Sequence, residues 1–404
     1  MRHRGFQRIG LMLIALLSLL GLLSSCGGAP PAAAPTAAAP AATAAAPAAA
    51  ATVAAPAATA AAPAAGGKIK VGLSFSDFAT ERWKPESQIL TKLLEEKGYE
   101  VMTQEANHDV KLQNDQIDNM VSQGAKALII VAEDGDAVVT AVDKAAAAGV
   151  KVIAYDRLIK SDKIAAYISF NNIEVGRQQA LGVMKALGID TRDVAKDGKA
   201  RVVKLGGSPT DNNAILFRKG QDEIVDKYVA DGKVEIVSDQ WVDNWDPANA
   251  LKLMENILTA QGNKIDAVVA SNDGTALGAL QAMKAQGLAG KVPISGQDAT
   301  ADGGNSIVKG ELTVSILKDI RNLAPLAVDL ADKLLKGEAV TGLKNYTLAE
   351  LTNDAKKTGE VPCIFLEVQQ VSKDNIYDLV VKSGFQKYDD VYKDIPDAQR
   401  PPMP

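Results

Sequence analysis

Short apolar runs alternate with amphipathic segments along the chain from residue 68 onwards. The apolar runs predict buried strands at Lys68–Phe75, Ala127–Ala132, Val150–Tyr155, Arg201–Leu205, Val234–Val237, Ala267–Ser271 and Val292–Gly296. Between them, apolar residues at helical spacing predict helices at Pro85–Lys97, Ala137–Ala148, Phe217–Val229, Ala248–Ala260 and Ala276–Gln286. This alternation is typical of parallel sheets with helices on both faces. Because the pattern restarts after a break near Asn171–Arg177, we expect an α/β fold with two lobes of similar architecture.

The first 25 residues have the pattern of an export signal. Arg2, Arg4 and Arg8 accompany an apolar run at 9–23, and small residues follow before Cys26. The run is shorter than the ~20 residues of a membrane-spanning helix. Small residues directly before Cys26 resemble the lipobox of bacterial lipoproteins, in which the cysteine becomes the lipid-bearing N-terminus. We therefore expect a signal peptide at 1–25 and a lipid anchor at Cys26, with an ordinary signal and an incidental cysteine as the alternative.

Residues 29–65 contain only Ala, Pro and Thr apart from Val53. Recurrent proline blocks helical hydrogen bonding, and the segment has no apolar face to bury, which favours an extended, disordered chain. We interpret residues 26–67 as an anchor and tether that hold the folded body outside a membrane. Low-complexity sequence without a function is the alternative.

The charge and the scarcity of cysteine and histidine exclude several function classes. The chain has 44 Lys+Arg against 49 Asp+Glu, a net charge of −5, which argues against a nucleic-acid surface. Cys26 and Cys363 are too few for a zinc or iron–sulfur cluster, and a lipid on Cys26 would leave Cys363 without a disulfide partner. His3 is removed with the signal and His108 follows no predicted strand, so nucleophile–histidine catalysis is not expected. We expect no enzyme activity, no catalytic residues, no cofactor and no metal.

Polar and aromatic residues gather where the predicted strands end, and open α/β sheets bind ligands at that edge. Carboxylates, amides and guanidinium groups are suited to binding hydroxyls. In chain order these residues are Asp77, Arg82, Trp83, Asp156, Arg157, Asp211, Asn213, Trp241, Trp245, Asn272, Asp273, Gln297 and Asp298. Structural roles stay open for some of them, because Asp211 or Asp273 could cap a helix and Asp156 with Arg157 could form a surface ion pair.

Two of the three tryptophans occupy the same local frame, Trp83-Lys84-Pro85 and Trp245-Asp246-Pro247. Proline fits the first turn of a helix, so each indole is expected at the lip where a strand has ended, one in each lobe. Two such indoles could stack on both faces of a flat ligand such as a sugar ring. The alternative is a hydrophobic staple, in which the indole packs on its own helix; we favour the staple for Trp241 and the ligand site for Trp83 and Trp245.

Residues 68–385 resemble the bacterial periplasmic sugar-binding proteins of the ribose/galactose class, particularly the D-xylose-binding proteins of ABC importers. The strings that carry the resemblance are ERW at 81–83, AYDR at 154–157, YISFNN at 167–172, GGSPTDNNAILFR at 206–218, DQWVDNW at 239–245, KIDAVVASNDGTA at 264–276 and KVPISGQDA at 291–299. The lipobox and the Ala/Pro tether depart from that family, which puts free periplasmic diffusion in doubt but not sugar binding.

The resemblance implies a type I periplasmic-binding-protein fold with three crossovers between the lobes and the ligand in the cleft. We assign 68–171 and about 319–343 to lobe 1, and 172–318 and about 344–395 to lobe 2. The resemblance implies sugar contacts from Arg82, Trp83, Asp156, Arg157, Asn213, Trp245, Asn272, Asp298 and Lys318. It also implies a monomer that delivers a monosaccharide, D-xylose above all, to the membrane subunits of an ABC permease.

Several alternatives compete with this interpretation. The ligand could be another aldose such as glucose or ribose, and the closed state could instead be read by a chemoreceptor or a histidine kinase. A sugar-sensing repressor would need a basic helix-turn-helix where this chain has a signal and tether. A dehydrogenase would need a glycine-rich turn after the first strand, and an EF-hand calcium site would need a D-x-D-x-D-G run; the sequence has neither.

Overall fold

The structure is a computed structural model that describes residues 67–404. The predicted signal peptide 1–25, the predicted lipid anchor at Cys26 and the predicted tether up to residue 66 lie outside the described residues. Over residues 67–404, no helix combines the length and hydropathy needed to cross a bilayer.

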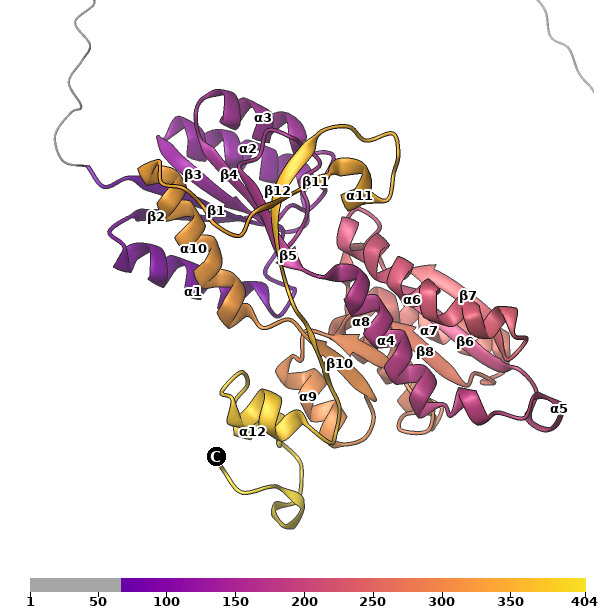
Figure 1. Ribbon diagram of the computed structural model, residues 1–404. Helices are drawn as coiled ribbons and strands as arrows, with labels where there is room; N and C mark the ends of the chain where they lie inside the picture. Colours follow the sequence, from indigo (N-terminus) through magenta and orange to yellow (C-terminus); the bar gives the residue numbers. More distant parts are fainter. Residues whose placement is uncertain (1–66) are drawn as a thin grey trace, which may run out of the picture. The chain divides into compact units, whose positions relative to one another are not determined.

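The first lobe is built on a seven-stranded sheet with the order β11-β12-β5-β4-β3-β1-β2 (Figure 1). Neighbouring strands are parallel except β11 and β12, which are antiparallel. The strands are β1 (Lys70–Phe75), β2 (Glu100–Glu105), β3 (Ala125–Ile130), β4 (Lys151–Tyr155), β5 (Ala166–Phe170), β11 (Lys344–Thr347) and β12 (Glu360–Leu366).

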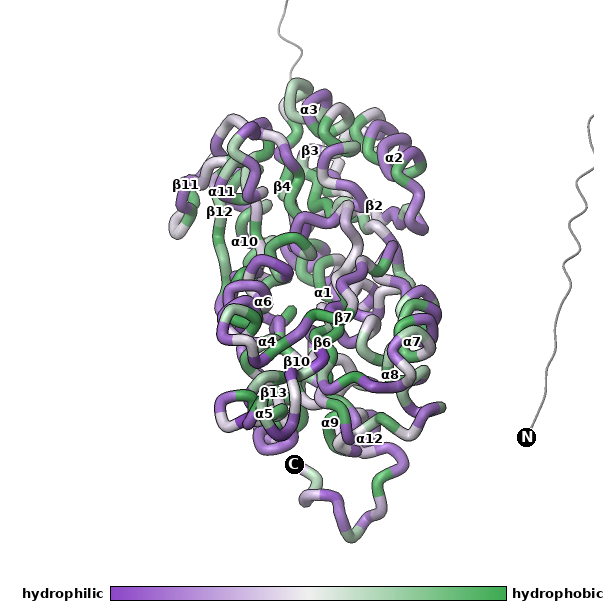
Figure 2. The backbone as a smooth tube through the Cα atoms, turned by 90° about the vertical axis from the view of Figure 1, so that its right-hand side faces the viewer, coloured by the Kyte–Doolittle hydropathy of each residue, from purple (hydrophilic) through white to green (hydrophobic). Residues whose placement is uncertain are grey.

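Helices cover both faces of this sheet because successive side chains of a strand point to opposite sides. On one face α1 (Trp83–Glu96) and α10 (Ile320–Lys336) pack together over Leu73 of β1. On the other face α2 (Val110–Ser122) and α3 (Val139–Ala147) pack over Leu128 of β3, and the short α11 (Leu348–Thr352) also belongs to this side. In Figure 2 strands β3 and β4 are largely hydrophobic, whereas α2 alternates between hydrophobic and hydrophilic residues, as expected for a helix with one buried face.

The second lobe contains two three-stranded ladders, β7-β6-β8 and β13-β10-β9, which a parallel bridge between Val268 and Ile294 joins. The strands are β6 (Ala200–Gly206), β7 (Val234–Trp241), β8 (Ala267–Ala270), β9 (Ser295–Gln297), β10 (Val314–Leu317) and β13 (Gln369–Val371). The main helices are α4 (Asn172–Ala186), α6 (Asn212–Ala230), α7 (Pro247–Gln261), α8 (Asp273–Ala285) and α9 (Ala301–Val308). Shorter helical segments are η1 (Ile189–Thr191), α5 (Val194–Asp197), η2 (Asp243–Trp245), η3 (Tyr377–Lys382), α12 (Tyr388–Val391) and η4 (Asp397–Gln399). Helix α4 packs against α6, and α7 packs against α8.

The chain passes between the two lobes three times, after β5, after β10 and after β12. The predicted two-lobed α/β fold is therefore confirmed, but one predicted boundary is wrong. Residues 344–366 were expected in lobe 2, whereas β11 and β12 extend the first sheet, with Cys363 opposite Tyr167 of β5. The return to lobe 2 occurs only at β13, which pairs with β10.

Candidate ligand-binding site between the lobes

One cavity collects every contact residue that the sequence predicts. Its lining contains all nine of them, from both lobes and from the crossover after β10: Arg82, Trp83, Asp156, Arg157, Asn213, Trp245, Asn272, Asp298 and Lys318. Thr80, Asp211, Phe217 and Gln297 complete the lining. An adjoining cavity shares Thr80, Arg82, Trp245, Asn272 and Asp298 with it and also reaches His108 and Asn244.

Asp156 is the central carboxylate of this cavity. It follows β4 in a left-handed backbone conformation (φ 59°) and is 2% exposed. Its side chain accepts hydrogen bonds from Arg82 (3.2 Å) and Asn213 (3.1 Å) and pairs with Lys318 at 2.8 Å. Burial raises the pKa of Asp156, but the positive charges of Arg82 and Lys318 outweigh that effect and bring the pKa down to about 2. The group is therefore ionised at neutral pH.

Arg82 connects carboxylates of the two lobes. Its guanidinium contacts Glu86 at 2.5 Å, Asp156 at 3.2 Å and, in the second lobe, Asp298 at 3.4 Å. Burial lowers the pKa of Arg82, but Asp156 and Glu86 hold it well above its usual range. One Nη atom is buried without a partner among the described residues, so the guanidinium keeps a donor for a further acceptor.

Arg157 does not form the surface ion pair with Asp156 that the sequence left open. It is 4% exposed, and its Nε lies 3.1 Å from Asp211 of the second lobe. Its Nη1 donates to the carbonyl of Ala132 at 3.1 Å and lies 3.6 Å from Glu133. Arg157 and Asp211 therefore form a second charged link between the lobes.

The two asparagines at the site, Asn213 and Asn272, lie at helix N-termini. Asn213, in the first turn of α6, donates to both the carbonyl and the carboxylate of Asp156. Asp211 is the N-cap of α6, as the alternative role proposed for it predicts. Asn272 is the N-cap of α8 and accepts from Thr275, so the capping role considered for Asp273 is wrong.

Lys318 brings a buried charge to the end of β10. It is 1% exposed, and its Nζ lies 5.2 Å from the ring centre of Phe170 and 5.7 Å from that of Phe217. A cation over aromatic faces is stabilised by the ring quadrupole, so these rings and Asp156 together hold the ammonium group at the cavity.

Trp83 and Trp245 are buried cavity residues, at 2% and 7% exposure. Both indole nitrogens lack a partner among the described residues. Trp83 is the first residue of α1 rather than the residue before it, and the guanidinium of Arg82 lies 4.4 Å from its ring centre. Trp245 packs against Phe217 at 6.2 Å and against the backbone of Gly207, where a Cβ atom would lie 1.9 Å from the indole.

Trp241 lies outside the cavity lining, but it does not pack as a buried staple. It is 37% exposed at the end of β7, and the guanidinium of Arg218 lies 4.3 Å from its ring centre. Stacking on the guanidinium of Arg218 of α6, rather than burial against the helix that follows it in the sequence, therefore accounts for its place.

Asp156, Trp245 and Asp298 all have positive φ values, of 59°, 56° and 93°. Left-handed backbone in residues other than glycine costs roughly 1–3 kcal/mol and persists where the surroundings hold it, often at binding sites. Such strain in three cavity residues indicates that the surrounding structure fixes the direction in which their side chains point.

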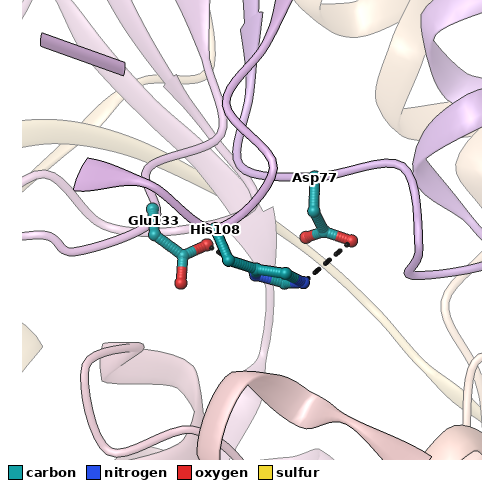
Figure 3. Close-up of side chains that lie close together, drawn as sticks. All are labelled: Asp77, His108 and Glu133. Carbon is teal, nitrogen blue, oxygen red and sulfur yellow. Dashed lines mark hydrogen bonds and ion pairs between the residues drawn. The ribbon is translucent and has the colours of Figure 1, made fainter. Parts of the chain in front are cut away.

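Asp77, His108 and Glu133 form the one group among residues 67–404 whose ligand atoms are near enough to share a metal ion (Figure 3). His108 lies between the carboxylates, with Nδ1 3.2 Å from Glu133 and Nε2 3.7 Å from Asp77. Opposite ring nitrogens face the two carboxylates, an arrangement that suits a protonated imidazole, which donates from both. The hydrogen bond to Glu133 raises the pKa of His108, which favours this charged form.

Sequence reasoning missed Thr80 and Phe217 as cavity residues. Phe217 lies four residues after Asn213 on α6, and this spacing places both on one helix face; that signal could have found it. His108 was discounted because no strand was predicted before it. The structure corrects this, since β2 ends at Glu105, three residues earlier.

The comparisons with known proteins agree with this geometry. Residues 71–339 match the model of the periplasmic binding protein domain. The chain belongs to the periplasmic binding protein family. A D-xylose-binding periplasmic protein of Escherichia coli is 43% identical over 320 residues, covering 79% of this chain and 92% of the relative. Its counterpart in Haemophilus influenzae is 42% identical over 324 residues, covering 80% and 92%.

Among solved structures, an ABC transporter solute-binding protein from Clostridium phytofermentans with bound β-D-glucose has a TM-score of 0.71 and 31% identity. The match covers 80% of this chain and 99% of that one. The family resemblance seen in the sequence is thus confirmed. By their names, these family members bind solutes, and the names specify different sugars.

Proposed function

We propose that this family member binds a monosaccharide, D-xylose first among the candidates, outside the cytoplasm and with high affinity, and delivers it to the membrane subunits of an ABC permease. The observation that supports this most is the pair of adjoining cavities between the lobes, of about 480 Å³ and about 20 Å³, where both lobes present hydroxyl-binding side chains beside buried indoles. D-Xylose is favoured because two relatives above 40% identity carry that name. The neighbour with bound β-D-glucose supports a second candidate, another aldose.

The proposed mechanism is hinge closure around the sugar. The first lobe contributes Arg82, Trp83, Asp156 and Arg157, while Asn213, Trp245, Asn272 and Asp298 come from the second. A ligand that contacts both sets gains interactions only when the lobes approach, so it shifts the population toward the closed state. Hinge closure of this kind is known for periplasmic binding proteins.

Specificity follows from the buried polar groups. A hydroxyl-binding group that a wrong ligand leaves unpaired in a closed cavity costs about 1–3 kcal/mol. Sugars that differ in one hydroxyl are therefore discriminated by the donors and acceptors that remain unsatisfied.

The proposed location is the outer face of the cytoplasmic membrane. A lipid on Cys26 would anchor the chain, and the Ala/Pro segment 29–65 would give the body reach toward the permease. In this proposal the protein acts as a monomer and catalyses no reaction. Presentation of the closed state to a chemoreceptor or a histidine kinase is the second candidate role, since closure produces the same signal for either partner.

Isothermal titration of the intact protein against D-xylose, D-ribose, D-glucose, D-galactose and glycerol tests the proposal. We expect tight 1:1 binding of one aldose, D-xylose before the others, and no heat from glycerol, which lacks a ring. Absence of binding to every sugar in the panel would refute the sugar-binding proposal, and preference for a hexose would refute D-xylose alone.

A further inference from the structure

Asp273 has a buried carboxyl group that contacts the loop Asp298–Thr300, which follows β9. It is the first residue of α8 and is 0% exposed. The backbone N–H and the hydroxyl of Thr300 donate to it at 2.9 and 3.2 Å, and the hydroxyl of Ser315 donates at 2.7 Å. Asn272, not Asp273, is the N-cap of α8. The Asp273 side chain therefore serves to accept these three hydrogen bonds from Thr300 and Ser315.

Three consecutive backbone N–H groups of this loop, those of Asp298, Ala299 and Thr300, donate hydrogen bonds to neighbouring residues. The N–H of Asp298 donates to the carbonyl of Ile316 at 2.8 Å, within the backbone of β10. The N–H of Ala299 donates to the hydroxyl of Ser315 at 2.9 Å, and that hydroxyl in turn donates to Asp273. Together with the N–H of Thr300, two of the three amides therefore depend on Asp273, one directly and one through Ser315.

The loop needs this support because its backbone is strained. Asp298 and Ala299 both have positive φ values, of 93° and 45°, which residues with a Cβ rarely adopt. Such conformations persist only where surrounding contacts hold them.

Two glycines, Gly296 and Gly303, leave room for the carboxyl group of Asp273. A Cβ atom on Gly296 or on Gly303 would lie 2.1 Å from a carboxylate oxygen of Asp273, so both backbones approach it closely. Burial raises the pKa of Asp273 to about 8, although the hydrogen bonds from Ser315 and Thr300 act to lower it. A buried carboxyl group without an ion-pair partner is costly, and its hydrogen bonds to the loop are the interactions that offset this cost.

We propose that Asp273 is a positioning residue for sugar binding, which holds the Asp298–Thr300 loop in the conformation that presents the Asp298 carboxylate to the cavity. The proposal rests on the proposed function, because its effect is exerted on sugar affinity. Asp273 itself does not line the cavity, so it acts through Asp298.

A double-mutant cycle on the intact protein tests this, with D-xylose and D-glucose as titrants. Above its pKa of about 8 the Asp273 carboxylate only accepts hydrogen bonds. Measured in that pH range, Asp273→Asn is nearly isosteric but replaces an acceptor oxygen by a donor that faces Thr300 or Ser315. In the parent protein we expect it to weaken sugar binding by about tenfold, within the range of coupled neighbours. In the Asp298→Asn background the same substitution should weaken binding by less than about threefold. Equal losses in both backgrounds would show a merely structural role and overturn the proposal.

Two further variants keep the test decisive. Ser315→Ala removes only the indirect support and should give a smaller loss with the same dependence on Asp298, which covers the case that Asp273→Asn does not fold. Asn305→Ala is the matched control, because Asn305 is a buried residue of α9 that donates to the carbonyls of Val391 and Lys393. It should lower the melting temperature and leave sugar affinity unchanged.

The outcomes separate the two proposals. If the parent protein binds none of the sugars, the proposed function fails and this inference fails with it. If the parent binds sugar and Asp298→Asn weakens binding while Asp273→Asn and Ser315→Ala do not, only the positioning role is refuted.

Discussion

Replacing Lys318 by methionine tests the charge network between the lobes. The Nζ of Lys318 lies 2.8 Å from Asp156, and both side chains are at most 3% exposed. Methionine keeps an unbranched apolar side chain against Phe170 and Phe217 and removes the charge. The substitution therefore isolates the ion pair from the packing around it.

The expected loss follows from the pKa of Asp156. Burial alone would raise this pKa, yet Arg82 and Lys318 bring it from 3.8 to about 2. At ~1.36 kcal/mol per pKa unit, the shift corresponds to about 2–3 kcal/mol of stability. Removing one partner of a buried pair costs roughly 3–5 kcal/mol when the other charge is left uncompensated. Because Arg82 remains at 3.2 Å, we expect Lys318→Met to lose about 2–3 kcal/mol at pH 7.

The pH dependence has a definite sign. Asp156 has a lowered pKa in the folded protein, so its stabilisation is present above its unfolded pKa of about 4 and is lost as the pH falls toward 2. Without Lys318 the folded pKa should rise, so this contribution to acid-induced loss of stability should shrink.

Urea denaturation at pH 7 and at pH 3, followed by circular dichroism, measures both effects. Lys382→Met is the control, because Lys382 is 64% exposed in its pair with Asp378 and an exposed pair is worth less than about 1 kcal/mol. If Lys318→Met proved as stable as this control, with the same acid profile as the parent, Arg82 alone would compensate Asp156 and our account of the network would be wrong.

Three further predictions concern the sugar site and the anchor. Arg157→Ala should weaken sugar binding by about 1.5–3 kcal/mol in calorimetry, the range for bonds to charged groups; unchanged affinity would leave Arg157 a structural role through Asp211, Ala132 and Glu133. Trp83→Ala and Trp245→Ala should each weaken binding by at least ~1 kcal/mol, and Trp241→Phe should not; the reverse ranking, read from intrinsic fluorescence titrations, would place the ligand elsewhere. Cys26→Ser should abolish lipid labelling and release the protein from membranes; unchanged retention in the membrane fraction would contradict the anchor.

Several buried parallel strands were predicted, but the buried strand β5 and the edge strand β2 were missed. Strands β1, β3 and β4 are apolar runs buried on both faces, so hydropathy alone indicates them. Strand β2 (EVMTQE) lies at the sheet edge with mixed exposure, and its polar residues hide it from a hydropathy pattern. Because β2 was missed, His108 could not be placed beside the cleft.

The lobe boundary after residue 343 was wrong for a different reason. Strand β12 belongs to the first sheet because Cys363 and its neighbours pair with β5, almost 200 residues earlier. Hydrophobic periodicity predicts that a segment is a strand but not which sheet it joins. The crossover that returns the chain to β13 depends on that long-range pairing.

The candidate site was predictable where its chemistry is polar. Strand ends and the family resemblance together indicated the nine contact residues, and the structure places all of them in one cavity. Phe217 was not found, because an apolar residue on a helix looks the same whether it faces the core or a cavity. Asp273 was correctly placed at the start of a helix after a strand, but its predicted role as N-cap was wrong. The sequence alone does not show that Asn272, rather than Asp273, caps α8.

The balance of charge in the cavity bears on the kind of ligand it favours. Its lining holds three cationic side chains, Arg82, Arg157 and Lys318, and three carboxylates, Asp156, Asp211 and Asp298. Each cation lies within 3.5 Å of at least one of these carboxylates. A sugar phosphate or a sugar acid would add a negative charge beside carboxylates whose cations are already paired, and such like-charge contact is unfavourable in a buried site. A neutral sugar leaves every pair intact and uses the remaining donor and acceptor capacity, so the same network that links the lobes also favours an uncharged polyhydroxyl ligand.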